Sequence, residues 1–447
     1  MAQADTIFAL SSGKPPSGVA VVRISGPGVA DALDALGCAG IEPRKAVLRN
    51  LIDSDSKGLI DRGLVLFFPA PNSFTGEDVA ELQVHGGRAV VEAVLDALSR
   101  LDRLRPAGPG EFTRRAFESG RMDLAEVEGL ADLIAAETDR QRAQALRQMG
   151  GGLSEKCRQW RETLLRSRAR IEAGFDFSDE DDVPDDVAAS VVDEARRLRV
   201  ELVAYLAGGR AGEVIRDGFR IALMGAPNAG KSSLLNFLAR RDVAIVTEHA
   251  GTTRDLIEVR LDIDGYYVVL TDTAGLREVD SPVEQEGIRR ARETGSESDL
   301  VLWLEEPGAP LEARSVPKEF DPARVWTVLT KQDLVGDLAN TEIDSKTQRF
   351  RISVRNGYGT DALIEALAEE IRVRSAAQED ILITRHRHRR DIEEAVDCLD
   401  AIGNGSQPLE LTAEHLRRAG DHIGRIVGAI DVEDLLDHIF GEFCIGK

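Results

Sequence analysis

The sequence predicts a multidomain protein of α/β and α parts: an N-terminal α+β domain, an all-helical domain split in two along the chain, and an α/β domain inserted between the halves. A length of 447 residues is too great for one hydrophobic core. The residue pattern changes from short β-rich runs to helical spacing near residue 119, and to alternating strands and helices near 217. Helical spacing returns after about residue 375, which indicates that the α/β part is an insertion.

The expected domain boundaries follow these changes in pattern. They are 1–118 for the N-terminal domain, 119–214 for the first helical part, 215–375 for the inserted α/β domain and 376–447 for the second helical part. Within the N-terminal domain, residues 18–24 and 63–68 are expected to be strands, because β-branched and other apolar residues follow a glycine there. Residues 88–101 have the apolar spacing of a helix.

Charged segments lie within the helical parts. The acidic run 178–186 is expected to be a solvated turn that carries a helix N-cap; a calcium loop is the alternative, but the glycine and spacing of an EF-hand are missing. Two basic groups are expected to be either solvated helix faces or local patches that bind phosphate: residues 385–390, and Arg161, Arg166, Arg168 and Arg170.

Composition excludes several classes of protein. Lys and Arg number 56 against 78 Asp and Glu, and a net charge of −22 argues against a general nucleic-acid-coating role. No apolar run approaches the roughly 18–20 residues of a membrane span, and the N-terminus lacks the pattern of a secretory signal. The four cysteines are far apart, with no CxxC and no nearby histidine cluster, so we expect reduced thiols in a cytosolic protein and no structural zinc site. They are Cys38, Cys157, Cys398 and Cys444.

A phosphate-binding loop follows the expected strand 219–224. The segment GAPNAGKSS begins at Gly225, and its glycines allow backbone N–H groups to curl around phosphates at the start of a helix. Lys231 is expected to reach the β- and γ-phosphates, and the Ser232 hydroxyl to bind Mg²⁺. The strand before the motif and the helix after it make a chance match improbable.

Two further parts of a nucleotide site follow downstream. The segment GTTRD contains Thr253, which is expected to complete magnesium coordination when the γ-phosphate is present. The run VVLTDTAG is expected to be a buried strand that brings Asp272 near the metal, with the Gly275 amide at the γ-phosphate. Together with the phosphate loop, these parts have the order found in P-loop GTPases.

The last parts select the base. In VLTKQD, the Asp333 carboxylate is expected to accept hydrogen bonds from guanine N1–H and N2, which adenine does not offer. The usual pattern has Asn where this chain has Thr330. Ser353 lies in a segment that fits the final guanine-contacting turn. The inserted domain is therefore expected to be a Ras-like P-loop GTPase domain.

The residue that positions the attacking water is not given by this pattern. Many GTPases have glutamine directly after DTAG, whereas this chain has Leu276, which cannot hydrogen-bond water. A partner or another side chain must supply the group. The acidic residues that follow are candidates, with exposed switch-region charges as the alternative: Glu278, Asp280, Glu284 and Glu286.

Segments along the whole chain resemble one family, the bacterial tRNA modification GTPases called MnmE or TrmE. Besides the GTPase parts, the residues that carry the resemblance are residues 5–7 (DTI), 22–26 (VRISG), 73–87 (SFTGEDVAELQVHGG), 109–117 (PGEFTRRAF) and 443–447 (FCIGK). The resemblance implies a folate-binding N-terminal domain, a split helical domain and an inserted G domain, in agreement with the residue pattern.

The resemblance also implies an activity and partners. Members of the family act as homodimers with the flavoprotein MnmG (GidA), in a heterotetrameric or larger complex, on the wobble uridine of certain tRNAs. The product carries an aminomethyl or carboxymethylaminomethyl group at C5. The one-carbon unit comes from a tetrahydrofolate derivative (5-formyl- or 5,10-methylene-tetrahydrofolate), and FAD is bound to the partner.

Residue roles follow by matching motif positions. The resemblance places K⁺ at Asn228, Thr247, His249 and Thr252, where the cation neutralises charge that an arginine finger neutralises in other GTPases. Glu284 matches the water-positioning glutamate. The nucleotide-binding residues expected in all are Asn228, Ala229, Gly230, Lys231, Ser232, Ser233, Thr247, Glu248, His249, Ala250, Gly251, Thr252, Thr253, Asp272, Thr273, Ala274, Gly275, Lys331, Asp333 and Ser353.

The resemblance assigns a second site to the N-terminal domain and the C-terminus. Arg23, Glu81, Arg121 and Lys447 match the folate-binding positions, with Arg121 where the family has lysine. Cys444 matches a C-terminal cysteine that serves the modification chemistry; without the resemblance it is interpreted as an inert thiol.

A second class of function stays open from the sequence. A GTP-dependent switch for RNA or ribosome assembly, without modification chemistry, would need the same G domain, because a nucleotide site does not fix the output. The N-terminal segments and the FCIGK ending favour the tRNA-modifying enzyme.

Overall fold

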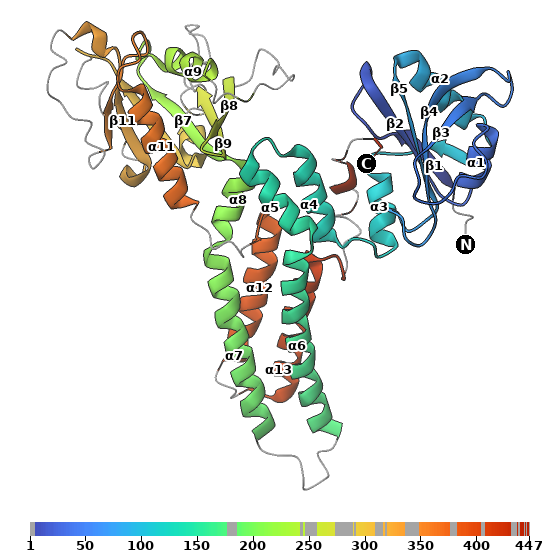
Figure 1. Ribbon diagram of the computed structural model, residues 1–447. Coiled ribbons are helices and arrows are strands. Elements are labelled where there is room, and N and C mark those ends of the chain that lie inside the picture. Colours follow the sequence, from blue (N-terminus) through green and yellow to red (C-terminus); the bar gives the residue numbers. More distant parts are fainter. Residues whose placement is uncertain are drawn as a thin grey trace. The chain divides into compact units, whose positions relative to one another are not determined.

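The chain forms two compact units (Figure 1). The first comprises Met1–Ala131, Ser154–Arg161 and Ile423–Lys447, and the second comprises Asp132–Leu153 and Glu162–His422. The computed structural model describes residues 5–176, 186–241, 245, 257–272, 289, 292–308, 316–317, 320–335, 348–375, 382–403, 407–430, 436, 439–441, 443 and 445–446.

A six-stranded sheet is the main feature of the first unit, in the order β3-β4-β5-β2-β1-β6. Neighbouring strands are antiparallel except β1 and β6, which are parallel. The strands are β1 (Thr6–Leu10), β2 (Ser17–Ser25), β3 (Val47–Ile52), β4 (Leu59–Phe68), β5 (Val79–Gly86) and β6 (Leu104–Pro106).

Two helices complete the core of this sheet. Helices α1 (Val29–Ala35) and α2 (Arg88–Ser99) contribute buried residues to the same apolar cluster as the strands. In β2 the side chains alternate, so that Val22 and Ile24 are buried in this cluster while Arg23 between them lies on the opposite face. The expected α+β class of the N-terminal part is confirmed.

The C-terminal residues return to the first unit. Phe440 and Phe443 pack with Leu124 and Val127 of α4 (Leu124–Ala135) in a separate apolar cluster. Ile445 forms an isolated antiparallel β-bridge with Pro109, which lies just before the start of α3 (Glu111–Glu118). The C-terminal residues therefore share one core with residues of α4.

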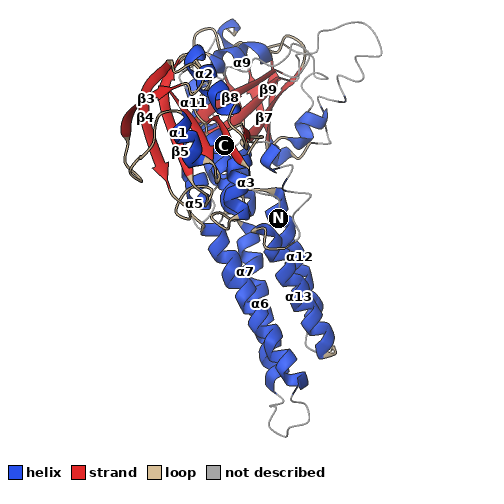
Figure 2. Cartoon of the chain, turned by 90° about the vertical axis from the view of Figure 1, so that its right-hand side faces the viewer, coloured by secondary structure: helices blue, strands red, loops and turns tan. Residues whose placement is uncertain are grey.

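Helices make up the rest of the second unit outside its sheet. They include α5 (Asp139–Met149), α6 (Gly152–Asp176), α7 (Asp186–Ala207), α8 (Gly209–Asp217), α12 (His386–Ile402) and α13 (Leu409–Ile426). The four long helices α6, α7, α12 and α13 lie alongside one another (Figures 1 and 2). Because α7 precedes the α/β domain in the chain and α12 follows it, the α/β domain is an insertion, as expected.

The inserted domain has a second six-stranded sheet, ordered β12-β11-β10-β7-β9-β8. All neighbours are parallel except β8 and β9. Its elements are β7 (Phe219–Gly225), α9 (Lys231–Ala239), β8 (Ile257–Ile263), β9 (Tyr266–Asp272), β10 (Leu300–Glu305), β11 (Val325–Leu329), β12 (Arg349–Arg351) and α11 (Thr360–Arg374). From β7 the chain passes to one side of the sheet, where β8 and β9 lie, and from β9 it crosses to β10 on the other side of β7. Ligands bind at the carboxyl ends of strands where the order reverses in this way.

The basic run 385–390 contributes to ion pairs of the helical part. Arg390 is 70% exposed, as expected of a solvated helix face, but Arg385 is only 16% exposed and His388 is fully buried. The ion pairs join Arg385 to Asp132, Arg389 to Glu213 and Arg390 to Glu394. Within this run, His388 therefore serves internal packing, whereas His386 and Arg390 lie on an exposed face of α12. The acidic run 178–186 lies outside the described residues apart from Asp186, which begins α7.

No helix among the described residues combines the length and the low polarity that crossing a membrane requires.

Candidate functional site

The phosphate loop connects β7 to α9. Gly225 ends the strand with φ +132°, and a Cβ there would lie 2.3 Å from the carbonyl oxygen of Leu304 on β10. Gly230 precedes the helix with φ +95°, and Asn228 also has a left-handed backbone, which asparagine tolerates better than most residues. The loop thus has the tight backbone that places N–H groups around an anion at a helix N-terminus.

Lys231 lies at the centre of this loop. Its ammonium group donates to the carbonyl oxygens of Gly225 (2.7 Å) and Ala226 (2.8 Å), and the residue is only 7% exposed. Burial lowers the pKa of Lys231, while the negative charge of Asp272 acts in the opposite direction. A buried cation between the loop carbonyls and Asp272 is placed to meet phosphate oxygens.

Ser232 and Asp272 come together although they are 40 residues apart. The Ser232 hydroxyl donates to the Asp272 carboxylate over 2.8 Å, and Asp272 is completely buried at the end of β9. Mg²⁺ prefers such oxygen ligands. In this arrangement Ser232 would hold the ion, and Asp272 would fix the orientation of the Ser232 hydroxyl.

The base-selecting residues also meet. Ser353 Oγ donates to Asp333 Oδ1 over 2.7 Å, which brings the loop after β11 to the turn after β12. Lys331 has φ +50° and pairs with Glu306 at 2.5 Å. Asp333 and Ser353 are 20 residues apart in the chain, but their side chains are adjacent at the carboxyl edge of the sheet.

Several expected site residues lie outside the part of the chain that the structure describes. They are Thr247, Glu248, His249, Ala250, Gly251, Thr252, Thr253, Thr273, Ala274, Gly275, Leu276, Glu284, Cys444 and Lys447. Ala229, which is buried, and Ser233, which is exposed, lie on either side of Lys231.

In the N-terminal domain, the structure brings Arg23 and Glu81 together. They are opposite each other in β2 and β5, and the guanidinium is 3.0 Å from the carboxylate. Arg23 also lies over the rings of Phe74 and Phe112, at 5.2 and 5.7 Å. Both ionic side chains stay about one-fifth exposed and Phe74 is partly exposed, so this face offers an arginine, a carboxylate and one aromatic ring to a ligand, while Phe112 is buried beneath Arg23.

Arg121 occupies a different position, just after α3. It is exposed, and its side-chain stem lies against Gly76 in the loop before β5. The same loop contains Phe74, so Arg121 is connected to the Arg23 region through residues 73–79 rather than by a direct contact among the described side chains.

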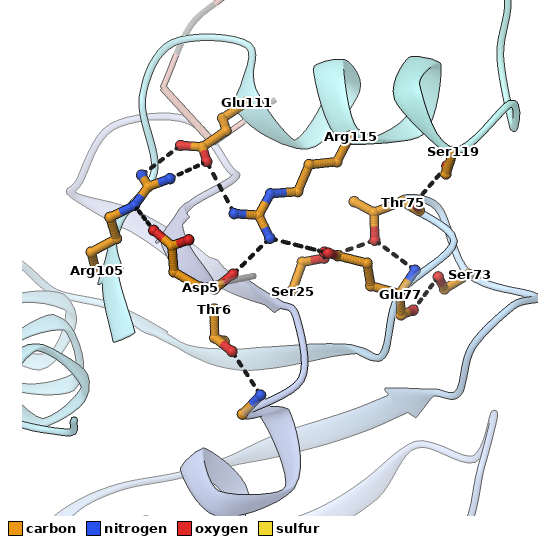
Figure 3. A network of polar contacts seen from close by, with 11 residues as sticks. Asp5, Thr6, Ser25, Ser73, Thr75, Glu77, Arg105, Glu111, Arg115 and Ser119 are labelled. Carbon is orange, nitrogen blue, oxygen red and sulfur yellow. Dashed lines mark hydrogen bonds and ion pairs between the residues drawn. The ribbon is translucent and has the colours of Figure 1, made fainter. Parts of the chain in front are cut away.

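Sequence reasoning missed a polar network that holds this loop (Figure 3). Arg115 on α3 donates to Glu77 at 3.0 Å, to Glu111 at 3.1 Å and to the backbone oxygen of Asp5 at 2.8 Å. Arg105 pairs with both Asp5 and Glu111, each at 2.5 Å. The network therefore ties α3 to β1, to β6 and to the loop that precedes β5.

Hydroxyl groups extend the network into the loop. Ser25 at the end of β2 lies 2.7 Å from Thr75 Oγ1 and donates to Glu77 at 2.8 Å. Ser119 donates to the backbone oxygen of Thr75 at 2.7 Å, and Ser73 donates to that of Glu77. Most of these residues belong to the segments that carry the family resemblance, which was the available signal for them.

The carboxylates of the network are stabilised in their charged form. Burial alone would raise the pKa of Glu111, but hydrogen bonds from Arg105, the Gly108 N–H and Arg115 outweigh it and lower that pKa. The hydrogen bond and charge of Arg105 likewise lower the pKa of Asp5.

Comparison with known proteins gives matches over nearly the whole chain. Residues 6–121 match the family described as "GTP-binding protein TrmE N-terminus", and residues 124–444 match "MnmE helical domain". The chain is 51% identical over 449 residues to the tRNA modification GTPase MnmE of Bradyrhizobium sp. (strain ORS 278), covering 99% of each chain. It is 50% identical over 445 residues to that of Rhizobium johnstonii, again covering 99% of each. Together, the two family matches and this identity show that the chain belongs to the MnmE family of tRNA modification GTPases.

Proposed function

We propose that this chain hydrolyses GTP in the course of tRNA modification. The observation that carries the proposal is the group of Lys231, Ser232 and Asp272 at the carboxyl ends of β7 and β9. It unites a buried cation for phosphate, a hydroxyl ligand for Mg²⁺ and a carboxylate that orients that hydroxyl. The names of the close relatives support the same activity.

Guanine is the proposed base. The Asp333 carboxylate is held by Ser353 and is 19% exposed, so it can still accept hydrogen bonds from N1–H and N2 of guanine. Adenine has no donor at those positions, and burying an unpaired carboxylate against it would be costly.

Potassium is proposed to support hydrolysis. Asn228, with its left-handed backbone in the phosphate loop, is the described member of the expected K⁺ ligands. With Leu276 unable to orient water, we assign that role to Glu284. Two G domains are proposed to meet across their nucleotide faces in a homodimer.

The proposed target is C5 of the wobble uridine in certain tRNAs, where an aminomethyl or carboxymethylaminomethyl group is added. The flavoprotein MnmG is the proposed partner and carries FAD, and the cytoplasm is the compartment in which the two meet tRNA. A tetrahydrofolate derivative supplies the one-carbon unit when bound. Arg23 suits its glutamate tail, Glu81 suits the amino-amide edge of its pterin ring, and the partly exposed Phe74 offers apolar surface.

Hydrolysis is tested by comparing GTP turnover in K⁺ and in Na⁺ at equal ionic strength. We expect faster turnover in K⁺, and we expect Glu284→Ala to slow it by roughly two to four orders of magnitude without weakening GTP binding. The exposed Glu297→Ala is the matched control and should change neither property. Equal rates in the two salts would show that Asn228 does not bind an activating cation. Unchanged turnover in Glu284→Ala would show that Glu284 does not position the attacking water.

The tRNA target is tested by nucleoside analysis of bulk tRNA from cells that lack the gene. We expect the modified wobble uridine to disappear and to return with the wild-type gene but not with Ser232→Ala. Unchanged tRNA nucleosides together with altered ribosome profiles would support the assembly switch instead.

A further inference from the structure

A cluster of metal-ligating side chains lies in the helical part, away from the nucleotide site. Asp391 and Glu394 are three residues apart on α12 and therefore share one face of that helix. His422 faces them from α13, and its Nδ1 lies 2.9 Å from Glu394 Oε2. All three belong to the second unit.

The spacing of these groups fits a single metal ion. One ligand atom from each of Asp391, Glu394 and His422 lies within 4.8 Å of the other two. Two ligands of one ion, each about 2.1 Å from it and about 90° apart, are roughly 3 Å from each other. The 2.9 Å between Nδ1 and Oε2 matches that separation, so an ion can bind with small side-chain movements.

The surroundings leave room for a cation beside the ion pair of His422 and Glu394. His422 is 13% exposed and Glu394 is 34% exposed, so solvent screens the cluster only in part. A pocket of about 380 Å³ adjoins it and leaves room for water ligands. The residues that line this pocket are Glu394, Asp397, Cys398, Ala401, His415, Arg418 and His422.

A second imidazole lies in the same pocket. His415 is seven residues before His422 on α13, two helical turns away on the same face. Its Nδ1 is buried and has no hydrogen-bond partner among the described residues. Cys398 lies one turn beyond Glu394, and burial raises the pKa of its thiol, which disfavours the thiolate that metals bind.

We propose that α12 and α13 hold a divalent transition-metal ion between them, with Asp391, Glu394 and His422 as its protein ligands. Two carboxylates carry two negative charges, of which Arg390 offsets the one on Glu394 in part, and a divalent cation would balance the rest. Arg390 donates to the other oxygen of Glu394 at 2.9 Å and orients it. Because one donor is nitrogen, the set suits Zn²⁺, Mn²⁺ or Fe²⁺ better than Mg²⁺ or Ca²⁺.

The sequence predicted no structural zinc site, because of the spacing of the cysteines and the lack of a histidine cluster near them. The ligands of the proposed site come from two helices and include no cysteine, so no short motif announces it. The ion would link α12 to α13 and stabilise the pair by mass action. The inference does not depend on the proposed GTP hydrolysis.

Zinc binding to the full chain tests the proposal. The protein is first stripped of metals with a chelator and then saturated with GDP and Mg²⁺, so that the nucleotide site is occupied. Calorimetric titration with Zn²⁺ is expected to reveal one tight equivalent, and Glu394→Gln or His422→Gln to weaken it about 100-fold or more. Glu393→Gln changes the exposed neighbouring carboxylate and is expected to leave binding intact.

X-ray absorption of the zinc-loaded wild-type protein gives a test that needs no variant. We expect one imidazole, oxygen ligands and no sulfur; a sulfur ligand would contradict the site by moving the ion to a cysteine. Retained GDP binding and circular dichroism show that the variants are folded. Absence of saturable zinc binding, or equal affinity in wild type, Glu394→Gln and His422→Gln, would reduce the cluster to an ion pair between Glu394 and His422.

Discussion

Thr330 shows how one side chain joins two parts of the nucleotide site. Its hydroxyl is buried and lies within hydrogen-bond distance of the backbone oxygens of Ala229 (2.8 Å) and Glu305 (3.1 Å). It therefore fastens the base-selecting segment to the phosphate loop. The usual pattern has Asn at this position. In this chain Thr330 differs from that pattern and makes this connection to the backbone.

Asp333 is the residue on which base preference depends. We expect Asp333→Asn to lower GTP affinity by roughly 100-fold or more and to raise affinity for xanthosine triphosphate, because an amide can donate to the xanthine O2. The measurement is competition between the two nucleotides. Asp361→Asn, which alters a 74% exposed carboxylate on α11, is the control and should leave the preference unchanged. Continued preference for GTP in Asp333→Asn would show that the Asp333 carboxylate does not select the base.

Glu111 is expected to make the stability of the N-terminal domain depend on pH. Its pKa in the folded protein lies below its unfolded value of about 4.3, so its stabilising contribution is complete above that pH and is lost as pH falls through the folded pKa. We expect Glu111→Gln to lower local stability by about 1–3 kcal/mol at pH 7 and by much less near pH 3. Hydrogen exchange of α3 amides at both pH values measures the difference. A pH-independent difference would contradict the argument.

At the scale of elements, the junction of β7 with its loop depends on a missing side chain. Gly225 pairs with Leu304 of β10, and a Cβ at Gly225 would meet the Leu304 carbonyl oxygen. We expect Gly225→Ala to destabilise the α/β domain by roughly 3 kcal/mol or more. Unfolding can be followed by the fluorescence of Trp303 and Trp326, which lie in β10 and β11.

A second variant, at Gly357, distinguishes the cost of a positive φ from the cost of the contact between a Cβ at Gly225 and Leu304. Gly357 also has a positive φ, +77°, but nothing lies within 4 Å of the position its Cβ would occupy. Gly357→Ala is therefore expected to cost only about 1–2 kcal/mol, from the backbone alone. Equal losses in the two variants would show that the contact with β10 is not what requires Gly225.

The elements of the α/β domain were predictable because their patterns are local. The run FRIALM and the run VVLTD are continuous and mostly apolar, as in strands buried on both faces, and a glycine-rich loop follows the first. The order of the strands depends on chain crossovers that no local pattern records. The antiparallel pairing of β8 with β9 is different: it is a hairpin closed by Asp264 and Gly265, both with positive φ, and this Asp-Gly turn is a local signal that sequence reasoning missed.

The site in the N-terminal domain was less predictable for the same reason. Arg23 and Glu81 were expected only from the family resemblance, and their contact depends on the register of β2 against β5. The pairing of Arg105 with Asp5 joins residues 100 positions apart. Arg105 lies outside the segments that carry the resemblance, so nothing in the sequence singled it out.

At the scale of the whole chain, the two ends of the sequence meet in the first unit. Phe443 packs in the cluster with Leu124, and Ser11 Oγ donates to the Gly446 backbone oxygen at 2.7 Å. Ser11 directly follows β1, in which Ala9 pairs with Arg23. The C-terminal residues therefore end close to the strand pair that presents Arg23, which supports a shared site for the expected folate ligands.

The placement of these residues leads to a prediction for Cys444. Cys444 lies outside the described residues, but its neighbours Phe443 and Ile445 belong to the first unit and contact Leu124 and Pro109 respectively. We expect Cys444→Ser to leave GTP turnover within about twofold of wild type and to abolish tRNA modification, since a serine hydroxyl replaces a thiol that ionises far more readily. Nucleoside analysis of tRNA and a phosphate-release assay measure the two effects. Ile445→Ala, at a 61% exposed side chain, should preserve both activities. Full tRNA modification by Cys444→Ser would show that the thiol takes no part in the chemistry. Loss of modification in both Cys444→Ser and Ile445→Ala would show that the effect comes from the placement of the C-terminal residues and not from the thiol.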